Sequence, residues 1–132
     1  MNSLLGFDYG TRKIGVAVGQ KITQSATPLL VLRNRNGQPD WSRIQALIQE
    51  WQPEAAVIGL PLNMDDSETA LAPRVRRFAR QIDGRFGLRV HLADERLSSQ
   101  EARAQRGASG ASREPVDALA AALILETWLR EP

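Results

Sequence analysis

The sequence contains no cysteine, and this absence excludes several kinds of chemistry at once. Without thiols there is no disulfide framework, no thiolate zinc site and no cysteine nucleophile. No apolar run approaches the length that spans a bilayer, and the start Met1-Asn2-Ser3 lacks the basic region of a secretory signal. We therefore expect a cytoplasmic protein that does not enter the membrane.

Lysine and histidine are almost as scarce as cysteine. The chain holds two Lys and one His against fifteen Arg, with a net charge of +2 and a pI of 9.7. Arginine favours bidentate contact with phosphate, although a GC-rich genome produces the same bias. Between Arg74 and Arg113, ten Arg stand against four acids. This stretch predicts either a nucleic-acid-binding face or ordinary solvated helix faces.

The residues that are present suffice for one domain over residues 1–132, of which 42% are hydrophobic. Apolar runs predict strands over 4–9, 14–19, 28–32, 55–60 and 88–93. Helical spacing predicts a helix from an N-cap at Asp40 to Trp51 and another from Pro73 to Gly84. A short helix near Ser98, a loop over 107–112 and a helix over 116–129 follow. His91, the single histidine, is expected to be a strand residue rather than a base.

This order of elements predicts an α/β fold with a mixed five-stranded sheet. Three antiparallel strands come first, two parallel strands follow, and helices cover both faces of the sheet. This is the ribonuclease-H-like order, in which the first strand is central and the last two strands lie beside it. The carboxyl ends of these three strands then share one edge, which is where open α/β sheets bind ligands.

Acidic residues stand where this edge would form. Asp8 ends the first strand, Asp94 and Glu95 end the last one, and Asp117 lies in the first turn of the final helix. Converging carboxylates need cations, and oxygen ligands without cysteine favour Mg²⁺ or Mn²⁺. We predict two ions for phosphodiester hydrolysis, with Asp8 bridging them, Glu95 and Asp117 each holding one, and Asp94 in reserve for Glu95. The predicted contacts to nucleic acid are Arg12, Lys13, Asn63, Arg74, Arg77 and Arg96.

Each acid also has a purely structural interpretation. Asp8 could begin a turn, and Asp117 could stabilise the N-terminus of its helix. Glu95 could form a surface ion pair with Arg96 or Arg12. The three acids therefore support a metal site only if the fold brings them together.

Four blocks in order resemble one known family. They are Gly6-Phe7-Asp8-Tyr9-Gly10-Thr11-Arg12-Lys13-Ile14-Gly15-Val16-Ala17, Val57-Ile58-Gly59-Leu60-Pro61-Leu62-Asn63-Met64-Asp65, Asp94-Glu95-Arg96-Leu97-Ser98 and Val116-Asp117-Ala118-Leu119-Ala120-Ala121. The chain resembles the YqgF (RuvX) family of Holliday-junction-resolvase-like proteins and pre-16S rRNA nucleases. The resemblance implies a ribonuclease-H-like, metal-dependent nuclease that matures the 5′ end of pre-16S ribosomal RNA. It places the family's acidic site on Asp8, Glu95 and Asp117.

The sequence departs from this pattern in three places. The loop between Ala102 and Val116 lacks the family's usual aromatic and Lys residues, and Asp66 stands where many relatives have Gly. The fourth strand ends without the acid that the wider ribonuclease-H class carries there.

Other functions stay open at this point. A DNA junction resolvase, as a homodimer, and a non-catalytic RNA-binding module are the alternatives; an RNA nuclease could act as a monomer or a homodimer. Asp8-Tyr9-Gly10-Thr11 also matches sugar-kinase-like ATP sites, but the chain has no room for their second domain.

Overall fold

The structure is a computed structural model that describes residues 3–63, 65, 67–94 and 116–131. The side chains of Val116 and Asp117 are not part of this description. The elements within these ranges are β1 (Ser3–Tyr9), β2 (Lys13–Gln20), β3 (Ser25–Arg33), α1 (Trp41–Trp51), β4 (Ala55–Leu60), α2 (Ala72–Phe86), β5 (Arg89–Asp94) and α4 (Val116–Arg130). The predicted succession of strands and helices is confirmed. The expected short helix near Ser98 and the loop over 107–112 lie outside the described residues.

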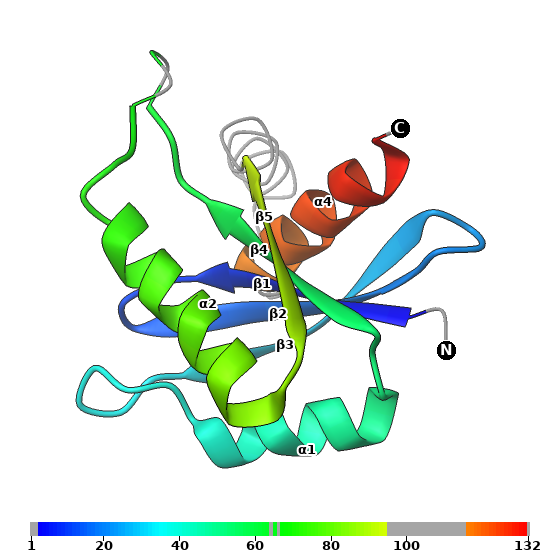
Figure 1. Cartoon of the computed structure of the whole chain (residues 1–132), viewed down its shortest axis with the longest axis horizontal. Coiled ribbons are helices and arrows are strands. Elements are labelled where there is room, and N and C mark those ends of the chain that lie inside the picture. The colour runs from blue at the N-terminus through cyan, green and yellow to red at the C-terminus, as the bar shows by residue number, and fades with distance from the viewer. Residues whose placement is uncertain (1–2, 64, 66, 95–115, 132) are drawn as a thin grey trace.

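The strands form one mixed sheet in the order β3-β2-β1-β4-β5. β1 is antiparallel to β2, and β2 is antiparallel to β3. β4 lies parallel to β1 on its other side, and β5 lies parallel to β4. Figure 1 shows β1 in the middle of the sheet. The predicted ribonuclease-H-like sheet is confirmed, and β1, β4 and β5 all end at the same edge.

The two faces of the sheet are covered by different helices, as predicted. α1 and α2 pack on one face, where Phe78 of α2 contacts Phe7 of β1 with ring centroids 5.6 Å apart. α4 packs on the other face through Ala121, Ile124 and Leu125. Alternation along β1 divides its side chains between these two cores, because neighbouring residues in a strand face opposite sides. None of the described helices is long and apolar enough to cross a membrane.

Glycines let α4 approach the sheet closely. A Cβ atom added at Gly6 would lie 3.1 Å from the carbonyl oxygen of Ala121 and 3.1 Å from Cβ of Leu125. One added at Gly19 would lie 2.7 Å from Cδ2 of Leu125. A Cβ atom at Gly6 would press on the backbone of α4, whereas one at Gly19 would meet only the side chains of Leu125 and Leu129, so Gly6 in particular sets the height of α4 above the sheet.

Two predicted boundaries were wrong. α2 continues through Gly84 to Phe86 and ends at Gly87, whose φ of 62° is the left-handed conformation that terminates helices. β3 begins at Ser25 rather than at Pro28, so the proline lies within the strand. The strand can accept it because β3 is at the edge of the sheet and Pro28 lies beside an irregularity in the pairing with β2. The N-cap at Asp40 is confirmed: its Oδ1 accepts a hydrogen bond of 3.3 Å from the backbone N–H of Arg43.

Candidate active site

Asp8 lies at the carboxyl end of the central strand β1, opposite Gly15 of β2. Asp8 is half-buried, and it lies on the same face of β1 as Gly6, which is the face that α4 covers. β4 lies between β1 and β5, and its last residue, Leu60, pairs with Asp94 at the end of β5. The structure therefore brings the ends of β1, β4 and β5 to one edge, as the sequence predicted.

The backbone of α4 brings its first turn to the same place. Ala121 and Leu125 lie over Gly6, and Leu125 and Leu129 lie over Gly19, which pairs near the start of β1. α4 therefore begins at the Asp8 end of β1 and runs toward the other end. Asp117 precedes Ala121 by one turn, about 6 Å along the helix axis.

Asp8 lies two residues beyond Gly6, which is about 7 Å along the strand. Starting from the contact of Gly6 with Ala121, the step along β1 to Asp8 and the step along α4 to Asp117 have nearly the same length and the same direction. The turn that contains Asp117 thus lies level with Asp8, on the face to which the side chain of Asp8 belongs. The side chain of Asp117 itself lies outside the described part of the chain.

Asp94 belongs to the opposite face of the sheet. His91 of β5 stacks on Trp128 of α4, with ring centroids 4.8 Å apart, and Ala93 packs in the same core. Val90 instead packs in the core beneath α1 and α2. By strand alternation Asp94 faces the α2 side, away from the α4 side of Asp8. Asp94 is therefore poorly placed as the reserve ligand.

The predicted metal ligands are only partly within the described residues. Glu95 lies outside them altogether, as does the side chain of Asp117. Among the side chains that are described, no group of three His, Cys, Asp or Glu could hold a metal ion. The structure thus places Asp8 and the backbone of Asp117, and the ligand set stays a prediction.

The turn between β1 and β2 carries Arg12 and Lys13, two predicted phosphate contacts, and both residues are exposed. Asn34, at the end of β3, braces this turn. Its Nδ2 donates to the carbonyl oxygens of Gly10 at 3.0 Å and Thr11 at 3.1 Å, and its backbone N–H donates to the carbonyl oxygen of Arg12 at 2.8 Å. Asn34 is a positioning residue that sequence reasoning missed.

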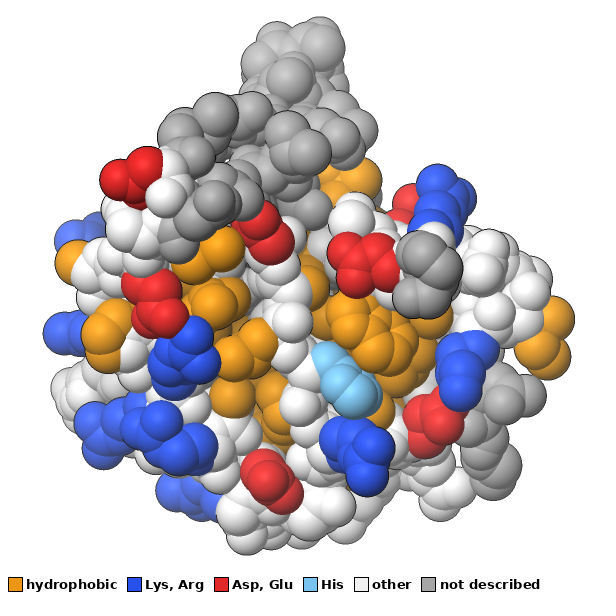
Figure 2. Space-filling model, turned by 45° about the horizontal axis from the view of Figure 1, so that its top comes forward, with side chains coloured by type: hydrophobic (Ala, Val, Ile, Leu, Met, Phe, Trp, Pro, Cys, Tyr) orange, Lys and Arg blue, Asp and Glu red, His pale blue; other side chains and the backbone are white. Residues whose placement is uncertain are grey.

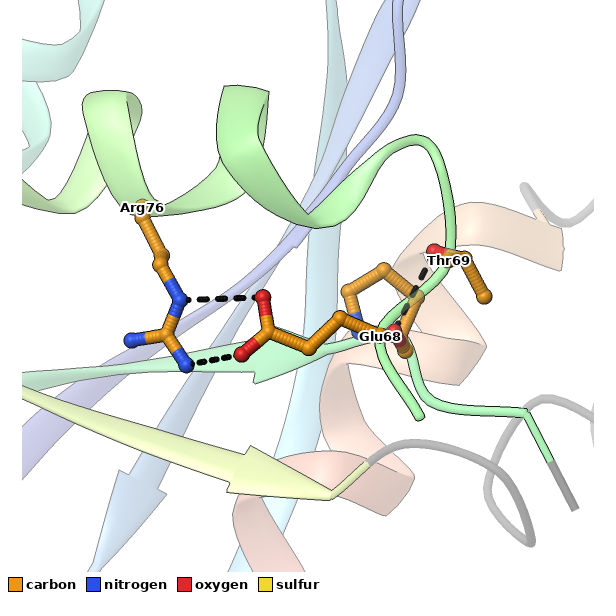
Figure 3. Close-up of polar contacts among 4 residues, drawn as sticks. Glu68, Thr69 and Arg76 are labelled. Atoms are coloured by element: carbon orange, nitrogen blue, oxygen red, sulfur yellow. Dashed lines mark hydrogen bonds and ion pairs between the residues drawn. The ribbon is translucent and has the colours of Figure 1, made fainter. Parts of the chain in front are cut away.

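The loop between β4 and α2 contains Asn63, another predicted contact. Asn63 is exposed, and its Nδ2 donates to the hydroxyl of Ser67 at 3.0 Å, so this side chain shapes its own loop. Thr69 closes the loop by donating its hydroxyl to the carbonyl oxygen of Pro61 at 3.1 Å. Figure 3 shows this bond beside the pair that ties the loop to α2.

That pair joins Glu68 of the loop to Arg76 of α2. Nε and Nη2 of Arg76 donate to the two carboxylate oxygens of Glu68 at 3.2 and 2.5 Å (Figure 3). The hydrogen bond from Arg76 lowers the pKa of Glu68 from its ordinary value, and the same bond raises the pKa of Arg76. Arg76 is thus engaged in holding the loop.

The remaining arginines of α2 have different surroundings. Figure 2 shows basic side chains gathered on the side of the molecule where Figure 1 places α2. Arg85 lies over the ring of Trp41, 4.2 Å from its centroid, which is a cation–π contact. Arg74 and Arg77, both predicted to contact nucleic acid, are exposed. Arg96, the last predicted contact, lies outside the described residues.

Comparison with known proteins adds a family match over nearly the whole chain. The model of the RuvX family, described as Holliday junction resolvase, matches residues 2–131. A protein of Azotobacter vinelandii named "Putative pre-16S rRNA nuclease" is 59% identical over 132 residues, which cover 97% of this chain and 93% of that protein.

Solved structures of two resolvases share the fold. The structure of T. thermophilus RuvC in complex with Holliday junction substrate has a TM-score of 0.56 at 20% identity, covering 94% of this chain and 92% of the other. The complex of the Fowlpox virus resolvase with substrate Holliday junction DNA has a TM-score of 0.58 at 10% identity, covering 96% of each chain. At these identities the likeness is one of fold, and it agrees with the predicted ribonuclease-H-like class.

Proposed function

This chain belongs to the RuvX family, as the four sequence blocks indicated, and we propose that it is a metal-dependent nuclease that hydrolyses phosphodiester bonds. The proposed substrate is the precursor of 16S ribosomal RNA, whose 5′ end the protein would mature by cleavage. We propose that the protein acts in the cytoplasm and consists of one domain over residues 1–132. The name and the 59% identity of the Azotobacter vinelandii relative support this substrate.

One observation carries the proposal. Asp8 and the first turn of α4, which contains Asp117, lie level with each other on one face of the sheet at the carboxyl end of β1. Asp94 faces the α2 side of the sheet, away from Asp8, and the third carboxylate that we propose is Glu95, which the resemblance to the family implies. The proposed catalytic and metal-binding set is therefore Asp8, Glu95 and Asp117.

The chemistry of these donors fits hard divalent cations, because all three are carboxylates. When bound, two Mg²⁺ or Mn²⁺ ions would activate the attacking water and neutralise charge on the departing oxygen. Asp8 would contact both ions, and Glu95 and Asp117 would contact one each. Arg12 and Lys13, on the braced β1–β2 turn, and Arg96 would orient the phosphates of the strand.

Substitution of Asp8 tests this proposal. We expect Asp8→Asn to reduce cleavage of a pre-16S RNA fragment by about 100-fold or more, because the amide cannot replace the bridging charge. RNA binding should stay within about two-fold of wild type, because the Arg and Lys side chains that would contact the phosphates are unchanged. Gel-based cleavage rates and fluorescence anisotropy measure the two quantities.

Asp83→Asn is the matched control, because Asp83 is an exposed carboxylate near the C-terminal end of α2 and is not part of the proposed site. It should cleave at the wild-type rate. Unchanged cleavage by Asp8→Asn would refute the assignment of Asp8 to the active site, whereas RNA binding without cleavage by the wild-type protein would favour a non-catalytic RNA-binding module.

Branched DNA is the second candidate substrate. The description of the matching family and the fold shared with two junction-bound resolvases favour it. A Holliday-junction resolvase makes paired cuts, so the two candidate substrates can be distinguished by the pattern and the rate of cleavage.

A further inference from the structure

A polar pocket lies beside Asp8 on the other face of the sheet, and the proposed reaction does not use it. Its volume is about 220 Å³. Two arginines of α2, one tyrosine and two glutamines supply its side-chain donors, and among the described residues no acid lines it. The lining residues are Tyr9, Gly37, Gln38, Pro39, Arg74, Arg77 and Gln81.

The walls of this pocket are held by the core. Tyr9, the residue after Asp8, packs on Phe78 with ring centroids 5.1 Å apart. Phe78 also stacks on Trp41, 5.8 Å away, which fixes the part of α2 that carries Arg77. The aromatic cluster therefore joins the strand of Asp8 rigidly to the helix of the pocket's arginines.

Besides β1 and α2, a tight turn before α1 forms a wall of the pocket. Arg35 and Gln38 exchange two backbone hydrogen bonds of 2.9 Å across it. The two residues between them, Asn36 and Gly37, have φ values of 52° and 74°, as in the turns that close two-residue hairpins. This geometry fixes the backbone of Gln38, one of the residues that line the pocket.

The charge and size of the pocket define its ligand. Arg74 and Arg77 are exposed, and within the described part of the chain neither forms an ion pair, unlike Arg76, which binds Glu68. Unpaired guanidinium groups beside neutral donors suit a phosphate. The volume is below the roughly 300 Å³ at which typical small-molecule sites begin, so a single phosphate group fits better than a whole metabolite.

We propose that this pocket binds a backbone phosphate of the nucleic-acid strand that Asp8 cleaves. This inference rests on the proposed function. Asp8 and Tyr9 are consecutive residues that face opposite sides of the sheet, so a strand cut on the α4 side can cross the carboxyl edge and reach the pocket. Arg74 and Arg77 supply the charge, and the hydroxyl of Tyr9 and the amides of Gln38 and Gln81 supply neutral donors.

Binding measurements test the pocket in the Asp8→Asn protein, where the strand stays intact. The probe is a fluorescein-labelled single-stranded RNA with the sequence around the 5′ end of 16S RNA. We expect Arg74→Gln/Arg77→Gln to weaken binding about ten-fold, because a phosphate loses both charged donors. The slope of log K against log salt concentration should fall by about 0.7, the value for one phosphate of a single strand.

The matched control is Arg43→Gln/Arg80→Gln, which removes the same charge from exposed positions of α1 and α2 that do not line the pocket. It should weaken binding by less than about two-fold. Equal losses in the two double variants would show only diffuse attraction and would overturn the inference. Thermal unfolding of each variant should match that of the parent, because all four side chains are exposed.

Inorganic phosphate distinguishes a backbone phosphate from the free anion. At constant ionic strength, millimolar phosphate should displace little of the RNA, and its own binding should be far weaker than that of the strand. Displacement of the RNA by micromolar phosphate would overturn the inference and identify a free-phosphate site.

Cleavage by the protein with Asp8 intact separates this inference from the proposed function. Arg74→Gln/Arg77→Gln should raise KM with little change in kcat. If Asp8→Asn abolishes cleavage while the pocket variant behaves like its control, only the pocket is wrong. If Asp8→Asn cleaves at the wild-type rate, the proposed active site is wrong whatever the pocket binds, and if the wild-type protein does not cleave, the proposed function is wrong.

Discussion

Asp94 ends β5 on the side of the sheet opposite to Asp8, and this placement argues against Asp94 as a metal ligand. The stacking of His91 on Trp128 identifies which residues of β5 face α4, and Asp94 is not among them. We expect Glu95→Gln to reduce cleavage by about 100-fold, as a lost ligand should. Asp94→Asn should cost less than about ten-fold, the lower range for residues that only support a site.

Initial cleavage rates in saturating Mg²⁺ or Mn²⁺ measure the difference between these two neighbouring carboxylates. Each substitution removes one negative charge, so each variant controls for the other. A larger loss in Asp94→Asn than in Glu95→Gln would make Asp94 the ligand and would contradict the assignment.

The sequence could predict which residues end the strands, but not which long-range contacts hold them. The face of Asp8 follows from the alternation of an apolar run, which is local information. Asn34 contacts Gly10 and Thr11 across 24 and 23 positions of the chain, so its role depends on the register between strands. A turn-forming asparagine reads the same in sequence whether or not it reaches such carbonyls.

At the scale of elements, the height of α4 above the sheet decides where its first turn lies. We expect Gly6→Ala to destabilise the fold by about 1–3 kcal/mol, because the new Cβ meets the backbone of Ala121 and the side chain of Leu125. Cleavage should also fall, since displacement of α4 moves Asp117 relative to Asp8. Urea unfolding and kcat measure the two effects.

Gly84→Ala provides a control of opposite sign. Gly84 lies inside α2, and a Cβ atom there meets nothing within 4 Å. Alanine should stabilise the protein by about 0.5–1 kcal/mol, because it limits the unfolded chain and favours the helix. An equal loss of stability in both variants would show that the substitution, and not the contact with α4, is responsible.

The pair between Glu68 and Arg76 predicts a local pH dependence. Its hydrogen bond lowers the pKa of Glu68, so the pair stabilises the loop above the ordinary pKa of a glutamate. This contribution is lost as the pH falls through the lowered pKa in the folded protein. NMR titration of the Glu68 carboxyl carbon should give a pKa below that of an exposed glutamate.

Arg76→Gln should return the pKa of Glu68 toward its ordinary value, because the main cause of the shift is removed. Arg80→Gln, at an exposed position of the same helix, should leave the pKa of Glu68 unchanged. A titration of Glu68 that does not respond to Arg76→Gln would show that the pair does not form in solution.

Sequence patterns located most elements but misplaced two ends, for a physical reason in each case. The prediction ended α2 at Gly84, yet a glycine closes a helix only where the backbone turns left-handed, and that happens at Gly87. The prediction began β3 at Pro28, yet pairing with β2 extends the strand to Ser25. Both errors concern contacts or conformations that apolar spacing does not encode.

At the scale of the molecule, the sheet separates Asp8 from the arginines of the pocket. Asp8 faces α4, whereas the arginines of the phosphate pocket lie on the α2 side. If Arg74 and Arg77 faced the carboxylates, they would neutralise them directly and weaken their attraction for divalent cations. With the sheet between them, the acids can bind metal while the arginines bind the same strand a short distance away.

The substrate itself is a property of the whole molecule, because symmetric cleavage of a four-way junction needs two active sites. Each chain contributes one proposed site, so a resolvase must act as a dimer, whereas a single cut at the 5′ end of a precursor RNA does not require one. We expect a pre-16S RNA fragment to be cut at least about ten-fold faster than a four-way DNA junction of equal length, since the curated relative carries an RNA-nuclease name. Parallel time courses on denaturing gels, with the Asp8→Asn protein as a blank and linear duplex DNA as a third substrate, measure this ratio. Paired, symmetric cuts in the junction at the faster rate would assign the protein to branched DNA, and equal rates on linear duplex would contradict both substrates.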